Sequence, residues 1–510
     1  MVCEINMIDS NVTGLAFAEE ECLKQLPVAP TWYALEPNSY SDFSGTPKMV
    51  ARTPLNPSRQ NQKGVITDLD AAGGFNTDLT QSNMVRLLQG FFFASVRQKP
   101  STQPINGTPR AITAVAGTAK TYAAAVGLNV FLPGHLVQAK GFGLTANNGI
   151  KTIVSATAGL ATVVETVADE GTPPVGAKLH AVGFQFPASD VSVAVANGQM
   201  TLNCAATNPS TLGLNPGEWI YLGGDATVNQ LALNAPGYAR VFSVGTTSIT
   251  FDMYDNVPAV DAGAAKALRI FFSTVLRNEN DPSLIVRRSY NLERQLGNDQ
   301  NGVQAQYLEG AVANEMTLNL KAATKLDMDL TFVALDDTSV DGAQGVKAGT
   351  RIAALGENAF NTSSDIEKFN MYILDNTTTM PLPLFGHVTD ATIKIANSVT
   401  VNKAIGSLGG IDTSAGNFEV TGSVTAYFTT IDAVAAIRNN SDVGVTIGVA
   451  ASNAGIIFDI PLLGLGNGKL AVTKDKAITV PLDIAAAQSQ FGYTLLAAFF
   501  PYLPTVAMPD

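Results

Sequence analysis

The residues whose types could do chemistry are few and widely spaced. His135, His180 and His387 lie in unrelated segments, and none forms a pattern such as H-x-x-x-H that would hold a metal ion. No G-x-S-x-G, phosphate-binding loop or dinucleotide fingerprint opens a predicted helix. The sequence therefore predicts no catalytic residue, no metal site and no cofactor.

Two pairs of carboxylates are the best candidates for chemistry. Asp68 and Asp70 form one pair, Asp327 and Asp329 the other, and each pair lies two residues apart on one face of a predicted strand. Such pairs can bind a hard cation or perform acid–base work, as in a glycan hydrolase. Nothing around either pair supports catalysis, so we favour a solvated acidic face and keep the enzyme as an alternative.

A basic cluster is formed by Arg287, Arg288 and Arg294, with Tyr290 as the one aromatic side chain among them. Nucleic-acid-binding surfaces interleave basic residues with several aromatic ones or carry a strong positive charge. In a chain of net charge −12, we expect these arginines to contact carboxylates of a neighbouring subunit instead.

Composition limits the fold that must position these residues. The chain has 510 residues, 46% hydrophobic and 15% charged, against about 25% charged in typical domains. The chain is longer than the roughly 250–300 residues that a single hydrophobic core supports, so we expect more than one core. Its pI near 4.8 argues against electrostatic binding of nucleic acid. With 45 glycines and 25 prolines, it is typical of a turn-rich β protein that buries neutral surface by assembly.

The sequence shows no pattern typical of a disulfide framework, a signal peptide or a membrane span. Cys3, Cys22 and Cys204 are too few and too scattered for a disulfide framework. The first residues do not read as a signal peptide, and no apolar run approaches the ~20 residues of a membrane span. We therefore expect no membrane contact.

Periodicity predicts the individual elements. Apolar and polar residues alternate over 326–332, which predicts a strand with one wet face. Short strands are expected at 64–67 and 75–80, with Gly73-Gly74 as a turn before the second. Met84, Leu87, Leu88 and Phe91 follow the helical repeat. The first forty-odd residues, rich in proline and aromatic residues, read as an arm that docks on another surface.

The last third of the chain repeats this plan. Residues 416–421 resemble 73–78, a second helix is indicated around 431–437, and 453–487 parallel 301–335. A nearly neutral insertion interrupts the first copy, and it carries its own repeat: the Pro-Gly turn in 131–137 resembles the one in 214–220. Most of the negative charge therefore lies outside the insertion.

The predicted fold class is mainly β, with a duplicated β-sandwich or barrel unit, flanking helices and two small inserted β modules. The expected organisation is an N-terminal arm (1–46), a discontinuous first unit (47–109 and 274–335), inserted modules (110–184 and 185–273), a linker (336–365) and a second unit (366–510).

Several segments resemble the major tail tube proteins of long, non-contractile bacteriophage tails, the siphophage type. They cover the arm and both copies but not the insertion, and they are Thr13-Gly14-Leu15-Ala16-Phe17, 31–40, 56–60, 74–81, 87–92, Ser289-Tyr290-Asn291-Leu292-Glu293-Arg294, 307–310 and 416–423.

This resemblance implies a virion protein whose subunits join sheets into stacked rings, assembled in the host cytoplasm. It implies contact with other copies, with tail terminator and tail tip proteins, with the tape measure protein and with DNA in transit. Some relatives fuse two tube units and form trimeric rings of pseudo-six-fold symmetry. The duplication favours that variant over a hexamer of single units.

An acidic channel would let DNA pass without binding, because carboxylates repel phosphates. We therefore expect one polar strand face, with Asp327, Asp329 and Glu419, to line the lumen. The insertion is expected to decorate the outside. The main alternative is another self-assembling β-rich protein, such as a surface-layer or adhesin protein.

Overall fold

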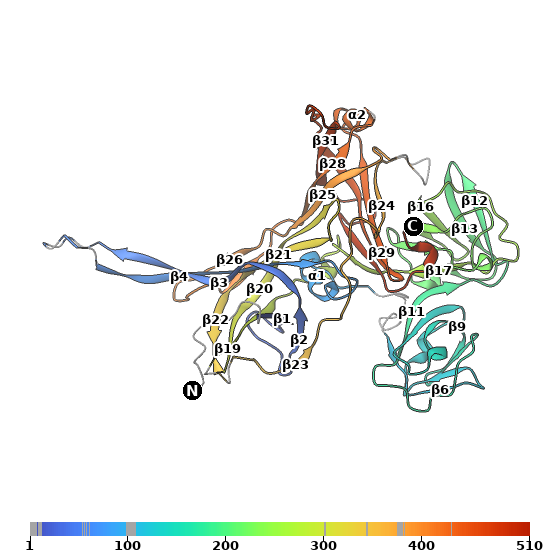
Figure 1. The fold of residues 1–510 in the computed structure, drawn as a ribbon, viewed down its shortest axis with the longest axis horizontal. Helices are drawn as coiled ribbons and strands as arrows, with labels where there is room; N and C mark the ends of the chain where they lie inside the picture. The colour runs from blue at the N-terminus through green and yellow to red at the C-terminus, as the bar shows by residue number, and fades with distance from the viewer. Residues whose placement is uncertain are drawn as a thin grey trace.

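The computed structural model describes the whole chain except residues 1–7, 9–12, 54, 56, 58, 61, 98–108, 300–301, 343–344, 375–380, 382, 430 and 510. Its strands form one 17-stranded sheet system, a separate 13-stranded sheet and a two-stranded sheet. Figure 1 shows a body with a long hairpin projecting from one side and a β-rich lobe on the other.

The 17-stranded system is built from two stretches of chain. The first contains β1 (Gly14–Glu19), β2 (Thr31–Leu35), β3 (Pro37–Arg52), β4 (Gln62–Asp78), α1 (Val85–Phe92), β18 (Thr274–Arg277), β19 (Tyr290–Asp299), β20 (Gly302–Lys321), β21 (Asp327–Ala334), β22 (Asp336–Val340) and β23 (Thr350–Ile352). The second contains β24 (Ile366–Ile373), β25 (Val388–Ala396), β26 (Thr400–Asn402), β27 (Asp412–Ser414), β28 (Glu419–Tyr427), α2 (Asp432–Arg438), β29 (Val443–Ala451), β30 (Ala454–Asn467), β31 (Thr479–Ala486) and β32 (Leu496–Phe500). The pair β26–β27 of the second stretch is not part of the 17-stranded system and forms the separate two-stranded sheet.

The two stretches share one plan, which establishes the duplicated unit. In the first, antiparallel pairing runs β3–β4–β21–β20. In the second it runs β25–β28–β31–β30. A helix follows the second strand of each set, and a hairpin, β19–β20 or β29–β30, leads into the last two strands. The units join where β20 pairs with β25.

The insertion folds as the 13-stranded sheet and is itself two similar halves. Its strands are β5 (Arg110–Ala111), β6 (Ala114–Ala116), β7 (Thr121–Ala123), β8 (His135–Lys140), β9 (Gly149–Ala156), β10 (Leu160–Val163), β11 (Lys178–Gln185), β12 (Val191–Ala196), β13 (Gln199–Cys204), β14 (Trp219–Leu222), β15 (Gly237–Val244), β16 (Ser248–Tyr254) and β17 (Arg269–Phe272). Pairing runs β6–β7–β10–β9–β8–β11 in one half and β12–β13–β16–β15–β14–β17 in the other. The halves meet where β11 pairs with β17.

Short 3-10 helices punctuate the connections, at Leu128–Val130, Thr145–Asn147, Pro209–Leu212, Thr227–Asn229, Pro282–Leu284 and Thr505–Ala507. None of the helices among the described residues is long and apolar enough to cross a membrane.

The core of the two units lies between their layers. A single cluster of buried apolar side chains includes Leu87, Leu88 and Phe91 of α1 together with Met328 and Leu330 of β21. These residues follow the predicted helical and strand periods, so both predictions are confirmed.

One local expectation was wrong. Gly73 and Gly74 form no turn but lie inside one continuous strand, β4. At both glycines, β4 is paired with β3 on one side and with β21 on the other. A Cβ on Gly73 would lie 2.3 Å from Leu308 Cδ1, so a larger residue here would force the buried Leu308 side chain to move. Within the expected arm, β1 pairs with β19 and with β2 of the same chain, and the extent of the arm stays a prediction. The expected linker contains two strands, β22 and β23, and the other domain boundaries stay predictions.

Candidate assembly surface

The side chains that point away from the core on β4, β21, β20, β25, β28 and β31 form one continuous surface, which we call the polar face. Asp327 and Asp329 lie on it. The Asn76 side chain donates hydrogen bonds to Asp327 (3.0 Å) and Asp329 (2.8 Å), and Asn319 donates to both at 2.8 Å. The amides tie three adjacent strands together.

Glu419 belongs to the same face, although it lies in the second unit. It is exposed at the start of β28, opposite Ala396 of β25, and Ala396 is opposite Glu315 of β20. The row that contains Asp329 continues through Thr317 and Lys394. The structure therefore brings all three predicted acidic residues onto one side of one sheet.

Carboxylates exceed amines on the polar face. Lys325 pairs with Asp78 at 2.7 Å and Lys394 pairs with Glu315 at 2.9 Å. Leaving aside Asp68 and Asp70 at the other end of β4, the face carries seven carboxylates, Asp78, Glu315, Asp327, Asp329, Asp390, Glu419 and Asp483, against Lys321, Lys394 and, just before β21, Lys325. Its net charge is therefore negative.

The three arginines of the basic cluster have partners within the same chain. The Arg287 guanidinium donates a hydrogen bond to the carbonyl oxygen of Thr413, and its Nη2 lies 3.5 Å from Asp412 Oδ1. Arg288 pairs with Glu19 at 3.0 Å. The inter-subunit role of all three stays a prediction.

Arg294 lies at the edge of β3. Its guanidinium covers the rings of Tyr40 and Phe43, and it donates a hydrogen bond to the carbonyl oxygen of Phe43 at 3.1 Å. The Arg294 side chain therefore meets the backbone of a strand that, among the described residues, pairs with β4 alone.

The other carboxylate pair is an ion-pair site. Lys403 reaches Asp68 at 2.6 Å and also contacts Asp70, while Lys48 contacts the same two carboxylates. Hydrogen bonds from Lys403 hold the pKa of both carboxyl groups below their usual range. The cluster fastens the loop before β27 to β4.

The histidines lie far apart in different settings. His135 is fully buried against Phe184, and burial lowers its pKa to about 4. His180 lies in the insertion and His387 is exposed beside the second unit. Within the described part of the chain, no group of three or more His, Cys, Asp or Glu side chains is placed to hold a metal ion.

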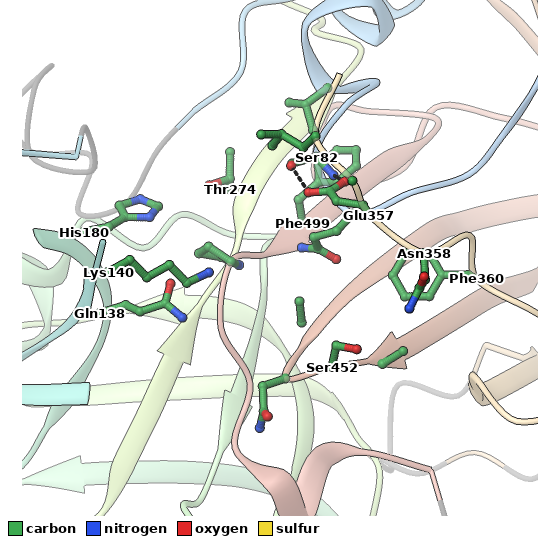
Figure 2. A pocket seen from close by; sticks show the side chains of 18 of the residues that line it. Ser82, Gln138, Lys140, His180, Thr274, Glu357, Asn358, Phe360, Ser452 and Phe499 are labelled. Atoms are coloured by element: carbon green, nitrogen blue, oxygen red, sulfur yellow. Dashed lines mark hydrogen bonds between the residues drawn. The ribbon is translucent and has the colours of Figure 1, made fainter. Parts of the chain in front are cut away.

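A cavity of about 1340 Å³ lies between the insertion and the body. Figure 2 shows Lys140 and His180 of the insertion on one side and Glu357, which accepts a hydrogen bond from Ser82, on the other. The pKa of Lys140 is lowered mainly by burial, and the positive charge of nearby Lys178 lowers it further. The hydroxyl of Ser82 also donates a hydrogen bond to the Glu357 carboxylate.

Sequence reasoning missed a buried charge cluster that anchors the insertion. Arg240 of β15 lies 3.1 Å from Asp459 of β30 and 2.8 Å from Asp252, with only 2% of its side chain exposed. Tyr493 donates to Asp459 at 2.9 Å, and Thr446 donates at 3.1 Å. The sequence signal was weak, because Arg240 and Asp459 are 219 positions apart in the chain.

Comparison with known proteins gives one clear result. A family model described as "Phage tail tube protein" matches residues 10–215 and residues 202–486. A search of curated proteins finds no similar sequence. Because the family model matches most of the chain, and the structure is mainly β with a duplicated unit, the chain belongs to the phage tail tube protein family.

Proposed function

We propose that three copies of this chain close into a ring and that the rings stack into the tail tube. The observation that carries this proposal is the β20–β25 pairing, which joins two tube units edge to edge inside one chain. Repeating the same kind of junction between chains extends the sheet, and a closed barrel leaves no exposed edge. Three chains then supply six units, in place of six separate subunits.

The polar face is proposed to line the channel through which the DNA genome passes. The opposite side of the same strands is occupied by core residues such as Met328 and Leu330, so it cannot face solvent. With Asp327, Asp329 and Glu419 on the wall, the channel repels phosphates and does not retain DNA by neutralising its charge.

The β3–β4 hairpin is proposed to connect successive rings. It extends well beyond the body in Figure 1. Near its tip, Met49, Val50, Val65 and Ile66 each have more than half of their surface exposed. A two-stranded hairpin is marginally stable alone in water, so we propose that another copy covers these side chains.

The remaining partners follow from the family and stay proposals. The tube ends would meet terminator and tip proteins, and the channel would hold the tape measure protein during assembly in the host cytoplasm. The insertion packs on the second unit through Trp219, Tyr238, Tyr372 and Phe500, away from the polar face, and would decorate the outside of the virion's tail.

The proposal is tested by the mass of the assembled particle. Purified protein is polymerised, imaged by negative-stain electron microscopy, and weighed by native mass spectrometry after mild dissociation into rings. We expect tubes and a species of three chains. Flat sheets would favour a surface-layer protein, and a six-chain ring would contradict the trimer.

A further inference from the structure

Strand β3 has a free edge that its counterpart in the second unit does not have. Within the described residues, β3 pairs with β4 alone, along a strand of 16 residues. Its counterpart, β25, is covered on the same side by β20. A long unpaired edge invites pairing with another strand, and natural proteins cover or blunt such edges.

Strand β30 has the complementary free edge. Its first half pairs on both sides, with β29 and β32. Its end, at Gly464–Asn467, pairs on one side with β31, and the structure shows no strand on the other side among the described residues. Just beyond, Leu470 and Val472 are 42% and 73% exposed. In the first unit, the equivalent part of β20 is covered by β25.

We infer that the free edge of β3 in one copy pairs antiparallel with the end of β30 in the next copy, with Thr46 opposite Gly466. This seam rests on the proposed ring and names the strands that close it.

The register follows from the seam that the chain already contains. There, Glu315 is opposite Ala396. Strands β21 and β31 are equivalent, and Thr331 and Asp483 are each the fifth of their eight residues. Glu315 is opposite Thr331, and Gly466 is opposite Asp483. Gly466 therefore takes the place of Glu315.

Thr46 takes the place of Ala396 by the same comparison. On the row of Thr331, the next two strands contribute Gly74 and Asp42. On the row of Asp483, they contribute Ser423 and Thr392. Ala396 lies four residues after Thr392, and Thr46 lies four residues after Asp42 with no bulge between them.

Arg294 is compatible with this pairing. It donates to the Phe43 carbonyl oxygen at the free edge of β3, and that oxygen has a second lone pair for an incoming strand. An arginine of the predicted basic cluster would thus lie at the seam.

A disulfide tests the seam directly. Thr46→Cys and Gly466→Cys are combined in a background with Cys3→Ser and Cys22→Ser, polymerised under reducing conditions, oxidised and separated on a non-reducing denaturing gel. Gly466 tolerates a side chain, because a Cβ there would lie 3.5 Å from Asp483 Cβ. Disulfides need Cβ atoms about 3.5–4.5 Å apart. In the matched control, Asp483→Cys takes the place of Gly466→Cys. Asp483 lies on β31, so it is farther from Thr46 by one strand spacing, roughly 4.8 Å.

We expect the test pair to give covalent dimers and trimers with no larger species, and the control to stay monomeric. Normal tubes with a monomeric test pair would overturn the seam while leaving the tube function intact. A ladder beyond three chains would also overturn it, because the contact would then run between rings. Failure of the unmodified protein to form tubes would instead count against the proposed function.

Hydrogen exchange on the unmodified protein gives a second readout that needs no variant. Amides of residues 40–46 should exchange at least tenfold more slowly in the tube than in the free subunit. Equal exchange in both states would refute the seam even if the cysteine variant failed to assemble.

Discussion

Replacing Arg240 tests how firmly the insertion is anchored to the second unit. The guanidinium is 2% exposed, and it bridges Asp252 of the insertion and Asp459 of β30. Asp459 is fully buried, whereas Asp252 retains 13% exposure. Arg240→Ala therefore leaves one carboxylate in the interior without its cation.

The expected cost follows from that burial. Removing one partner of a buried pair typically costs about 3–5 kcal/mol, because the remaining charge keeps its desolvation penalty. Tyr493 and Thr446 still donate hydrogen bonds to Asp459, which places the expected loss near the lower end, about 3 kcal/mol.

The assay is urea unfolding of the unassembled subunit, followed by tryptophan fluorescence. The chain has two tryptophans, and Trp219 lies beneath Arg240 with 5.8 Å between guanidinium and ring. Trp32→Phe in both proteins leaves Trp219 as the reporter of the interface.

A double replacement supplies the control. Arg240→Met with Asp459→Leu removes both charges, so it should be less destabilising than Arg240→Ala alone. Two results would refute the coupling. One is a loss of unfolding free energy below about 1 kcal/mol for Arg240→Ala. The other is a double variant whose loss equals the sum of the losses of Arg240→Met and Asp459→Leu made singly.

Two further predictions concern packing and accessibility. Gly73→Ala should destabilise the subunit by about 1–3 kcal/mol, because its Cβ would meet Leu308, whereas Gly464→Ala, with open space around it, should change the midpoint of thermal unfolding far less. Cys204 is buried and its pKa is raised to about 12, mainly by burial, so a thiol reagent at pH 8 should label exposed Cys22 within minutes and Cys204 only on unfolding; equal rates would contradict the buried environment.

Local patterns predicted the elements well where one periodicity dominates. The alternation over 326–332 and the helical repeat from Met84 to Phe91 both reflect a single buried side, so each could be recognised without its neighbours. The duplication was visible for the same reason, since both copies repeat the same order of strand, helix and strand.

Long-range pairing was not predictable in the same way. Gly73-Gly74 reads locally as a turn, and only the approach of Leu308 shows why glycine lies inside a strand. Residues 14–19 read as part of an arm because their pairing partner, β19, lies more than 250 residues away. The shared face of Asp327, Asp329 and Glu419 likewise depends on the β20–β25 junction, for which the sequence gives no signal.

A cryo-electron microscopy map of the assembled tube at side-chain resolution would test the proposed ring and channel most directly. We expect three chains per ring, with the polar face of β4, β21, β20, β25, β28 and β31 on the inner wall and Asp327, Asp329 and Glu419 pointing into the channel. A map that places these three carboxylates on the outer surface of the tube would contradict this arrangement.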